Sequence, residues 1–421
     1  MRNITRNNRS AWLVVMSLLF GVSTARAQEA PSGTEGTGSK VAQATPEPKK
    51  TFEFYGFTML DFGHDFKQID PDWYETMRVT RLPSFANQFG EDHNTFASVR
   101  QTRFGVRSST PTALGELKTH FEFNLFGSGP NSGEIAFRLR HAYGELGAFG
   151  AGQTWSVFMD SSIFPNSIEF FGPTGIVWFR NAQVRWMPVK GTHNVTVALE
   201  RPGASGDDGI YADRVELDNI RARFPLPDFT GAYKYVQGWG HVQAAGLVRK
   251  INWDDVLDDE FELSGDAVGW GINLTSNLKP TKNDLVRLAF VFGEGIQNYM
   301  NDSPVDIGVV NNLSNPVRPL LGEPLPVVGL SAFVDHTWNE KFSSTVGYSW
   351  QDNDNTDAQE PSAFKSGHYA LGNLLYYPVP NVMVGSELQW GRRENFSDGF
   401  QSDGFKIQFS FKYNFSWKLG E

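Results

Sequence analysis

The last strand-like segment of the chain constrains the fold more than any other feature. From Phe405 to Trp417, large apolar side chains occupy every second position, and the positions between them carry Lys, Gln, Ser or Asn. Successive side chains of a β-strand point to opposite faces, so this segment has one apolar and one hydrated face. Strands of soluble proteins usually have about five or six residues, so an aromatic row of this length favours a membrane strand.

The same alternation recurs upstream, and polar turn-forming segments separate its occurrences. It is clear in 117–125, 135–139, 195–199 and 286–292. A sheet exposed to lipid must close on itself, because an open edge would leave unpaired amides in hydrocarbon. At roughly 10 residues per membrane strand plus turns and loops, the ~370 residues after position 50 fit about sixteen strands. We therefore expect an all-β fold, a transmembrane antiparallel β-barrel wide enough for an aqueous lumen.

The N-terminus has the pattern of an export signal. Three arginines precede the apolar stretch 11–22, and Ala25-Arg26-Ala27 follows it. This pattern predicts a secretory signal peptide over residues 1–27. Residues 28–50 are rich in Pro, Gly, Ser and Thr and predict a flexible periplasmic segment. Residues 51–421 show no further compositional break, so we expect one barrel domain in the outer membrane of a Gram-negative-type bacterium.

The composition argues against several other functions. The chain has no cysteine, so disulfides, thiolate metal sites and thiol nucleophiles are excluded. Without the signal peptide, 33 basic residues face 47 acidic ones, which disfavours nucleic-acid binding. The motifs Gly-x-Ser-x-Gly, His-Glu-x-x-His and Gly-x-x-x-x-Gly-Lys-Ser/Thr do not occur, and the histidines lack metal-ligand spacing. We predict no catalytic residues, no metal site and no cofactor, and hence no enzyme.

If the apolar positions face lipid, the intervening positions line the lumen, and these carry more basic than acidic residues. Most acidic residues lie instead in loop-like runs. Guanidinium groups at a narrow point would attract anions and pair with carboxylates through two parallel hydrogen bonds. Alternatively, lumen arginines pair with lumen acids and only brace the wall. The pore-lining candidates are Arg103, Arg107, Lys118, His120, Arg138, Arg140, Arg185, Arg221, Arg223 and Arg287.

Within this set we favour Arg103, Arg138, Arg140 and Arg185 for an anion-binding constriction. The segment Asp160–Gly175 is long, and its Pro and Phe residues break the alternation. It could fold into the lumen as a constriction loop or extend outside the cell, and the pattern does not decide between them.

Several short stretches, in this order along the chain, resemble the DcaP-like outer-membrane porins from about residue 51 onward. They are 100–105, 138–144, 151–156 with 158–160, 238–241, 269–271, 292–296, 378–385 and 391–395. The resemblance implies a sixteen-stranded homotrimer with an arginine-rich constriction that favours small carboxylates, including dicarboxylates. As partners it implies outer-membrane lipid, lipopolysaccharide, the barrel-assembly machinery and small anionic solutes.

The function expected from these observations is a passive diffusion channel for small hydrophilic solutes, with a preference for anions. Two other classes are compatible with a membrane barrel. One is an outer-membrane hydrolase whose Ser-His-acid site is assembled across strands. The other is a structural or adhesive surface barrel with a closed lumen.

Overall fold

The computed structural model describes residues 50–419 of the 421-residue chain. The expected signal peptide and nearly all of the expected periplasmic segment lie outside the described residues. Within residues 50–419, no helix has the length and apolar composition needed to cross a membrane. The strands of the main sheet are β1 (Thr51–Asp65), β2 (Asn94–Ser98), β3 (Arg103–Thr112), β4 (Gly115–Phe126), β5 (Ile135–Leu146), β6 (Phe149–Trp155), β7 (Arg180–Val189), β8 (His193–Glu200), β9 (Ile220–Arg223), β10 (Asp228–Gln237), β11 (Gly240–Asp255), β12 (Gly265–Leu278), β13 (Asp284–Glu294), β16 (Pro326–Asn339), β17 (Phe342–Asn353), β18 (Phe364–Tyr376), β19 (Val382–Asn395) and β20 (Gln401–Leu419).

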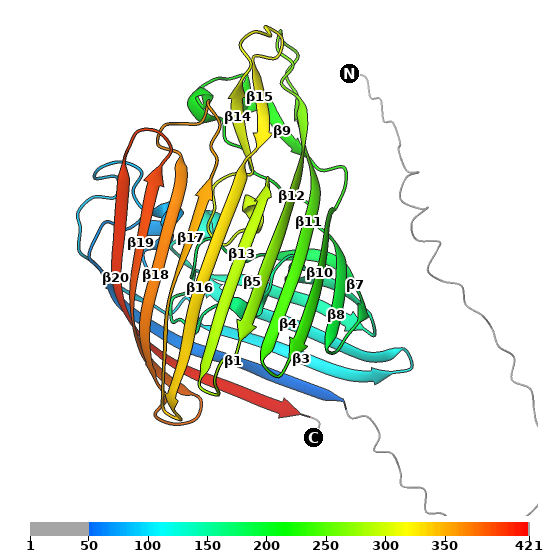
Figure 1. The fold of residues 1–421 in the computed structure, drawn as a ribbon, viewed down its shortest axis with the longest axis vertical. Coiled ribbons are helices and arrows are strands. Elements are labelled where there is room, and N and C mark those ends of the chain that lie inside the picture. The colour runs from blue at the N-terminus through cyan, green and yellow to red at the C-terminus, as the bar shows by residue number, and fades with distance from the viewer. Residues whose placement is uncertain (1–49, 420–421) are drawn as a thin grey trace, which may run out of the picture. The chain divides into compact units, whose positions relative to one another are not determined.

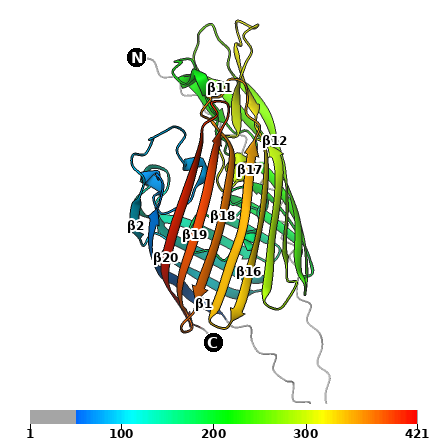
Figure 2. The ribbon, with the colours of Figure 1, turned by 60° about the vertical axis from the view of Figure 1, so that its left-hand side comes forward.

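The sheet closes into a barrel because the first and last strands pair with each other (Figures 1 and 2). Along β1, Phe52 pairs with Leu419 and Asp65 pairs with Lys406 of β20, and the other edge of β1 pairs with β2 and β3. β2 and β3 pair with successive parts of β1, and β9 and β10 pair with successive parts of β11. Each of these two pairs occupies the position of one strand in the barrel. The eighteen strands of the main sheet therefore form a barrel of sixteen antiparallel strands, as the sequence predicted.

The two ends of the barrel differ in the length of their connections. At the end where β1 begins and β20 ends, turns of two to five residues join neighbouring strands. At the other end the connections include 66–93, 156–179, 201–227 and 295–325, the last of which carries the hairpin of β14 (Ile307–Asn311) and β15 (Leu320–Pro324) (Figure 1). Short turns are periplasmic and long loops extracellular in bacterial outer-membrane barrels, which orients the molecule.

The alternation along each strand separates an outer apolar face from an inner polar face. On β20, Phe409 is 43% exposed and Phe411 is 40% exposed, whereas Gln408 is 1% and Ser410 is 0% exposed. The outer side chains face the bilayer, which covers them in the membrane. The inner side chains of the long strands are buried because loops cover them.

Two loops fill the half of the lumen that the long strands enclose. Loop 66–93 packs Met77, Val79 and Leu82 against Phe333, Tyr369 and other inner residues of β16 and β18. Loop 156–179, hereafter the constriction loop, packs Phe158 and Met159 against inner residues of β11 and β13. The opposite wall, β3 to β7, keeps its basic side chains only partly covered, except for Arg140, which is buried. The open part of the lumen therefore runs along this wall.

Candidate functional site at the pore constriction

The constriction loop enters the lumen, which decides between the two alternatives left by the sequence. It begins at an anchor on β10, β11 and β12. The carboxylate of Asp160 accepts hydrogen bonds from Lys234 Nζ (3.0 Å) and Thr275 Oγ1 (2.9 Å), and its Oδ2 lies 2.7 Å from Nε2 of His241. It also accepts from the backbone N–H and the hydroxyl of Ser162 within the loop. The first turn of the loop is thereby fixed to the wall.

The middle of the loop is held on the far side of the lumen by β19 and by loop 66–93. Glu387 of β19 accepts from the Ser167 hydroxyl (2.9 Å) and from the backbone N–H of Ile168 (3.0 Å). Glu169 accepts from the backbone N–H of Met77 (3.0 Å). The loop therefore crosses from the wall at β10–β12 to the wall at β19 and returns to β7.

The loop also brings a serine, a histidine and a carboxylate together, as the hydrolase alternative requires. In a catalytic triad the histidine uses one ring nitrogen for the serine and the other for the acid. Here the same Nε2 of His241 lies 2.7 Å from Asp160 and 3.4 Å from Ser162, and the serine hydroxyl donates to Asp160. This arrangement anchors the loop and is not that of a triad.

Two carboxyl groups of the loop have shifted pKa values. Burial raises the pKa of Asp160, but hydrogen bonds from His241 and Ser162 and the charge of Lys234 outweigh burial and hold it well below its usual value. Burial raises the pKa of Glu169 to about 7, although Lys406 and backbone N–H donors oppose this shift. Asp160 is therefore an ionised anchor at neutral pH, whereas Glu169 changes charge near neutrality.

Between the constriction loop and the β3–β7 wall lies a cavity of ≈ 600 Å³, hereafter the upper cavity. Phe164, Phe170, Phe171 and Trp178 of the loop segment form one side of its lining. Glu169 is its only carboxylate among the described residues. The basic residues that line the upper cavity are Arg103, Arg138, Arg140, Arg180 and Lys412.

Two of these arginines share one buried carboxylate as their counter-ion, which leaves the cluster with a net charge of +1. Glu122 of β4 is 5% exposed and accepts a hydrogen bond from Nε of Arg140 (2.6 Å). Its Oε1 also lies 3.6 Å from a terminal guanidinium nitrogen of Arg103. The hydroxyl of Tyr55 donates to the other oxygen of Glu122 (2.7 Å). Arg103 and Arg140 therefore pair with a lumen carboxylate and brace the barrel wall, which is the second of the two alternatives considered for the lumen arginines.

The other three cations of the upper cavity have no carboxylate within 4 Å in the part of the chain that the structure describes. Arg138 donates from Nε to the side-chain oxygen of Asn124 (3.2 Å) and also lies over an aromatic ring of the loop. The guanidinium carbon of Arg180 lies 4.6 Å from the ring centre of Trp155. The ammonium nitrogen of Lys412 lies 4.1 Å from the ring centre of Phe57. Aromatic faces hold these cations in place without neutralising them, so their charge is available to an anion.

Four other sequence candidates line a second cavity of ≈ 510 Å³ nearer the periplasmic turns, hereafter the lower cavity. They are Arg107, Lys118, His120 and Arg185. Arg107 lies over the ring of Tyr55 at 4.0 Å, and Lys118 forms an exposed ion pair with Glu116 (3.1 Å). Arg185 was expected at the constriction, but it lies with this lower group.

Arg287 lies inside the barrel in a bracing position. Its guanidinium pairs with Asp335 (2.7 Å) and donates to the backbone oxygen of Ser162 in the constriction loop. It therefore holds the loop against β13 and β16.

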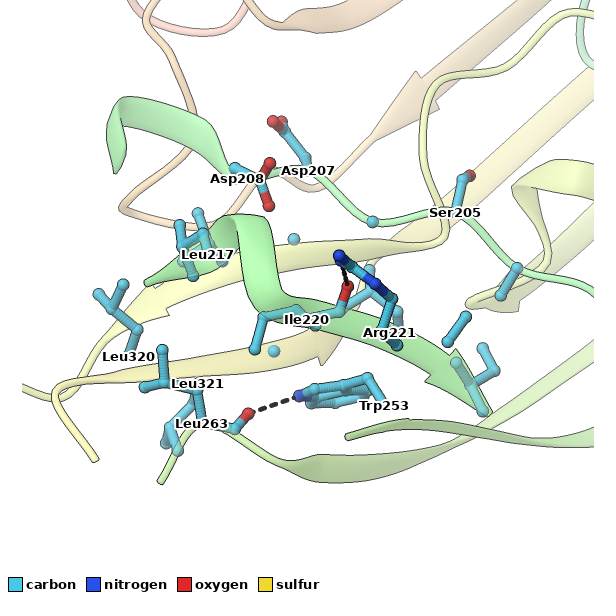
Figure 3. Close-up of a pocket in the computed structure, with 18 of the residues that line it drawn as sticks. Ser205, Asp207, Asp208, Leu217, Ile220, Arg221, Trp253, Leu263, Leu320 and Leu321 are labelled. Carbon is cyan, nitrogen blue, oxygen red and sulfur yellow. Dashed lines mark hydrogen bonds between the residues drawn. The ribbon is translucent and has the colours of Figure 1, made fainter. Parts of the chain in front are cut away.

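The expectation for Arg221 and Arg223 is wrong. Both lie on β9, a four-residue strand inside extracellular loop 201–227, and not on a membrane-spanning part of the barrel. Figure 3 shows Arg221 beside Trp253 in a cavity of ≈ 440 Å³ between β9, β11 and the β14–β15 hairpin, where its guanidinium donates to the backbone oxygen of Ile220 (2.9 Å). Arg223 forms an exposed pair with Asp254 (2.7 Å).

Arg180 was absent from the sequence candidates because its position breaks the parity rule. On β7 the inward side chains are those of Asn181, Gln183 and Arg185, so Arg180 has the outward parity. It is the first residue of the strand, where the chain leaves the constriction loop, and its side chain turns into the upper cavity. A basic residue at the junction of an inward loop and a strand is the signal that could have identified it.

Comparison with known proteins supplies the family. A family model described as DcaP outer membrane protein matches residues 36–415. The chain belongs to this family. Membership confirms the resemblance seen in the sequence and places this DcaP-family protein in the outer membrane. No match is found among curated proteins.

Solved structures share the DcaP-family fold. The outer membrane channel DcaP of Acinetobacter baumannii superimposes with a TM-score of 0.73 at 23% identity, over 87% of this chain and 97% of that one. An anion-selective porin from Comamonas acidovorans gives 0.57 at 10% identity, over 87% and 100%. OmpT of Vibrio cholerae in its trimer form gives 0.54 at 13% identity, over 87% and 100%. The architecture is therefore that of an outer-membrane porin.

Proposed function

We propose that the protein is a passive diffusion channel that prefers small anions, and carboxylates in particular. The observation that carries this proposal is the set of cations without carboxylate partners, Arg138, Arg180 and Lys412, in the cavity beside the constriction loop. A guanidinium group presents two parallel donors that match a carboxylate, and it stays protonated at any physiological pH. Aromatic side chains of the loop exclude water from one side of the cavity and thereby strengthen these interactions.

Several cations around one cavity also suit a solute with two carboxylates. The two groups of a dicarboxylate can contact different cations at the same time, which a monocarboxylate cannot do. We therefore include dicarboxylates among the preferred solutes. We propose no catalytic activity and no closed adhesive barrel.

The proposed assembly is a homotrimer in the outer membrane, in contact with lipid and lipopolysaccharide and inserted by the barrel-assembly machinery. The trimer form of the Vibrio cholerae protein concerns that protein, and its low identity to this chain leaves the assembly state to be measured. Cross-linking in native membranes measures it directly.

Reversal potentials across planar bilayers in a salt gradient test the anion preference. The wild-type reversal potential should lie on the side of the anion's equilibrium potential, and dicarboxylates should enter liposomes faster than neutral sugars of similar size. The double variant R138Q/R180Q should lower the anion-to-cation permeability ratio by about three- to tenfold, which corresponds to about 0.7–1.4 kcal/mol. R223Q is the matched control, because Arg223 lies in an extracellular loop and is paired with Asp254. Cation preference of the wild type, or equal ratios for both variants, would reject the proposal.

A further inference from the structure

The upper and lower cavities lie one after the other along the same wall. They share no lining residue among those described. On β4, Asn124 pairs with Arg103 of β3 and Arg138 of β5. Four residues nearer the periplasmic turn, His120 pairs with Arg107 of β3. Because a strand rises by about 3.3 Å per residue, these two rows of cations are about 13 Å apart along β4.

The lower cavity also contains cations that no carboxylate neutralises. Arg107 and Arg185 have no carboxylate within 4 Å among the described residues. The guanidinium group of Arg185 donates to the backbone oxygen of Trp155 (2.5 Å) and lies 5.1 Å from the ring centre of Tyr143. The charged residues that line the lower cavity are Glu53, Arg107, Lys118, Glu145, Arg185 and Lys418. Four of these side chains are basic and two are acidic, so this compartment also attracts anions.

Glu122 occupies the stretch of β4 between the two rows. It lines neither cavity. Its carboxylate already binds Arg140 and Arg103, and the Tyr55 hydroxyl that donates to it also lies 2.6 Å from Nε2 of His120. A carboxylate of the protein therefore sits where a permeating carboxylate would otherwise meet two more guanidinium groups.

We propose that the pore binds permeating carboxylates at two stations in series and that Glu122 is a resident counter-ion which keeps the passage between them from becoming a trap. The upper station consists of Arg138, Arg180 and Lys412, and the lower station of Arg107 and Arg185. This inference rests on the anion preference proposed above and adds a rate-determining role for Glu122.

The physical reason lies in the opposing demands of conduction. A permeating ion must bind strongly enough to enter and weakly enough to leave, and several moderate sites conduct better than one deep site. Without Glu122, Arg103 and Arg140 of the upper cavity would carry two uncompensated charges and extend its basic surface toward Arg107 and Arg185. An anion would then be held longer at the passage. With Glu122 in place, the anion moves between two separate groups of cations.

Single-channel recording of E122Q with succinate as the probe tests the proposal. Gln has nearly the same shape as Glu and still accepts the Tyr55 hydrogen bond, but it raises the net charge of the cluster of Glu122, Arg103 and Arg140 from +1 to +2. The variant should shift the reversal potential further toward the anion's equilibrium potential. It should also lengthen succinate blocking events by about tenfold, equivalent to about 1.4 kcal/mol, and lower the saturating succinate flux.

Two further variants keep the interpretation unambiguous. E122Q/R140Q restores the net charge of the cluster and should return the blocking time toward the wild-type value. E216Q removes a carboxylate that pairs with Arg214 (3.0 Å) in extracellular loop 201–227 and lines neither cavity, and it should leave the blocking time unchanged. If E122Q does not insert as a conducting barrel, R140Q tests the proposal from the opposite side. It lowers the net charge of the cluster from +1 to 0 and should shorten succinate blocking events, whereas unchanged events would overturn the counter-ion role of Glu122.

The outcomes separate this inference from the proposed function. If the wild type prefers anions but E122Q has unchanged or shorter blocking times, the counter-ion role of Glu122 is wrong and the proposed function stands. If E122Q increases the saturating flux, Glu122 is a simple electrostatic barrier and the two-station scheme is also wrong. If the wild type itself shows no anion preference, the proposed function fails first.

Discussion

Replacing Asp160 with Asn should release the beginning of the constriction loop from the barrel wall. The substitution keeps the shape of the side chain but removes the charge that Lys234 and His241 face at 3.0 and 2.7 Å. It also leaves Lys234, whose side chain is 26% exposed, without its counter-ion. Breaking a buried pair by removing one partner costs about 3–5 kcal/mol, and hydrogen bonds to a charged group contribute about 1.5–3 kcal/mol each. The released population should therefore rise by about 10²- to 10³-fold.

The absence of cysteine from the chain makes this release measurable. Ile163 lies just after the anchor, is 3% exposed and packs against Ile176 and Ala289. A single cysteine introduced as I163C is protected while the loop is docked and reacts with a maleimide when the loop is released. The labelling rate reports the released population if the loop closes faster than the thiol reacts. We expect labelling of D160N/I163C to be about 10²- to 10³-fold faster than that of I163C, together with noisier single-channel currents.

The matched control is D284N, which removes the carboxylate of another aspartate–histidine pair, Asp284–His336, near a periplasmic turn; neither side chain forms a hydrogen bond to the constriction loop. D284N/I163C should label at the rate of I163C. Because the pKa of Asp160 lies below its usual value, its contribution is present above the ordinary carboxyl range and is lost only as the pH falls through the lowered value. Relative to a fully exposed cysteine labelled at the same pH, labelling of I163C should therefore not accelerate when the pH is lowered from 7 to 5. Labelling rates of D160N/I163C and I163C within twofold of each other would refute the reasoning.

Two further predictions follow from the loop and its contacts. Glu169 is the only carboxylate among the described residues that line the upper cavity, and its pKa of about 7 means that it gains negative charge as the pH rises from 6 to 8. The reversal potential should therefore indicate a weaker anion preference at pH 8 than at pH 6, and an equally large change in E169Q would contradict this assignment. A methyl group added at Gly329 would lie 2.4 Å from the backbone oxygen of Gly175, whereas one at Gly372 would meet nothing within 4 Å. G329A should lower barrel stability by about 1–3 kcal/mol and G372A by less than about 1 kcal/mol, as measured by the temperature at which the folded gel band disappears; equal losses would count against this reading of the contact.

The barrel was predictable because its determinant is local. Each membrane strand, such as β20, has one face toward lipid and the other toward water, so apolar and polar residues alternate along it in the sequence. The chain length then limits the number of strands that can form. These arguments need no knowledge of which strands meet, because closure satisfies the backbone hydrogen bonds in any case.

The parity rule was less reliable for individual pore residues. It applies within a regular spanning strand and fails at strand ends, which is why it missed Arg180. It also cannot distinguish a spanning strand from a short strand in a loop, because both alternate. Arg221 and Arg223 satisfy the rule on β9, and neither lies on a spanning part of the barrel.

The inward course of the constriction loop was beyond any local argument. It depends on pairs far apart in sequence, such as Asp160 with His241 and Ile168 with Glu387. The same holds for the division of the cations into neutralised and free groups. Glu122 and Arg140 have the lumen parity, as Arg138 does, and only the three-dimensional contacts show which arginines the carboxylate reaches.

The negative net charge of the protein, −10, does not oppose an anion-selective pore, because the charges are separated in space. The constriction loop packs against Leu247 of β11, and the acidic run around Asp258 begins beyond the end of that strand at Asp255. Eight residues of extended strand span about 26 Å, which is roughly three Debye lengths at physiological ionic strength. The acidic loops are therefore screened from a solute at the upper cavity.

At about 0.01 M salt the Debye length reaches about 30 Å, so the acidic loops then act on an arriving anion before the cations of the cavity do. At 0.01 M salt the anion-to-cation permeability ratio of the wild type should therefore be lower than that of a variant in which Asp258, Asp259 and Glu260 are neutralised together. At 0.15 M salt the two proteins should have the same ratio.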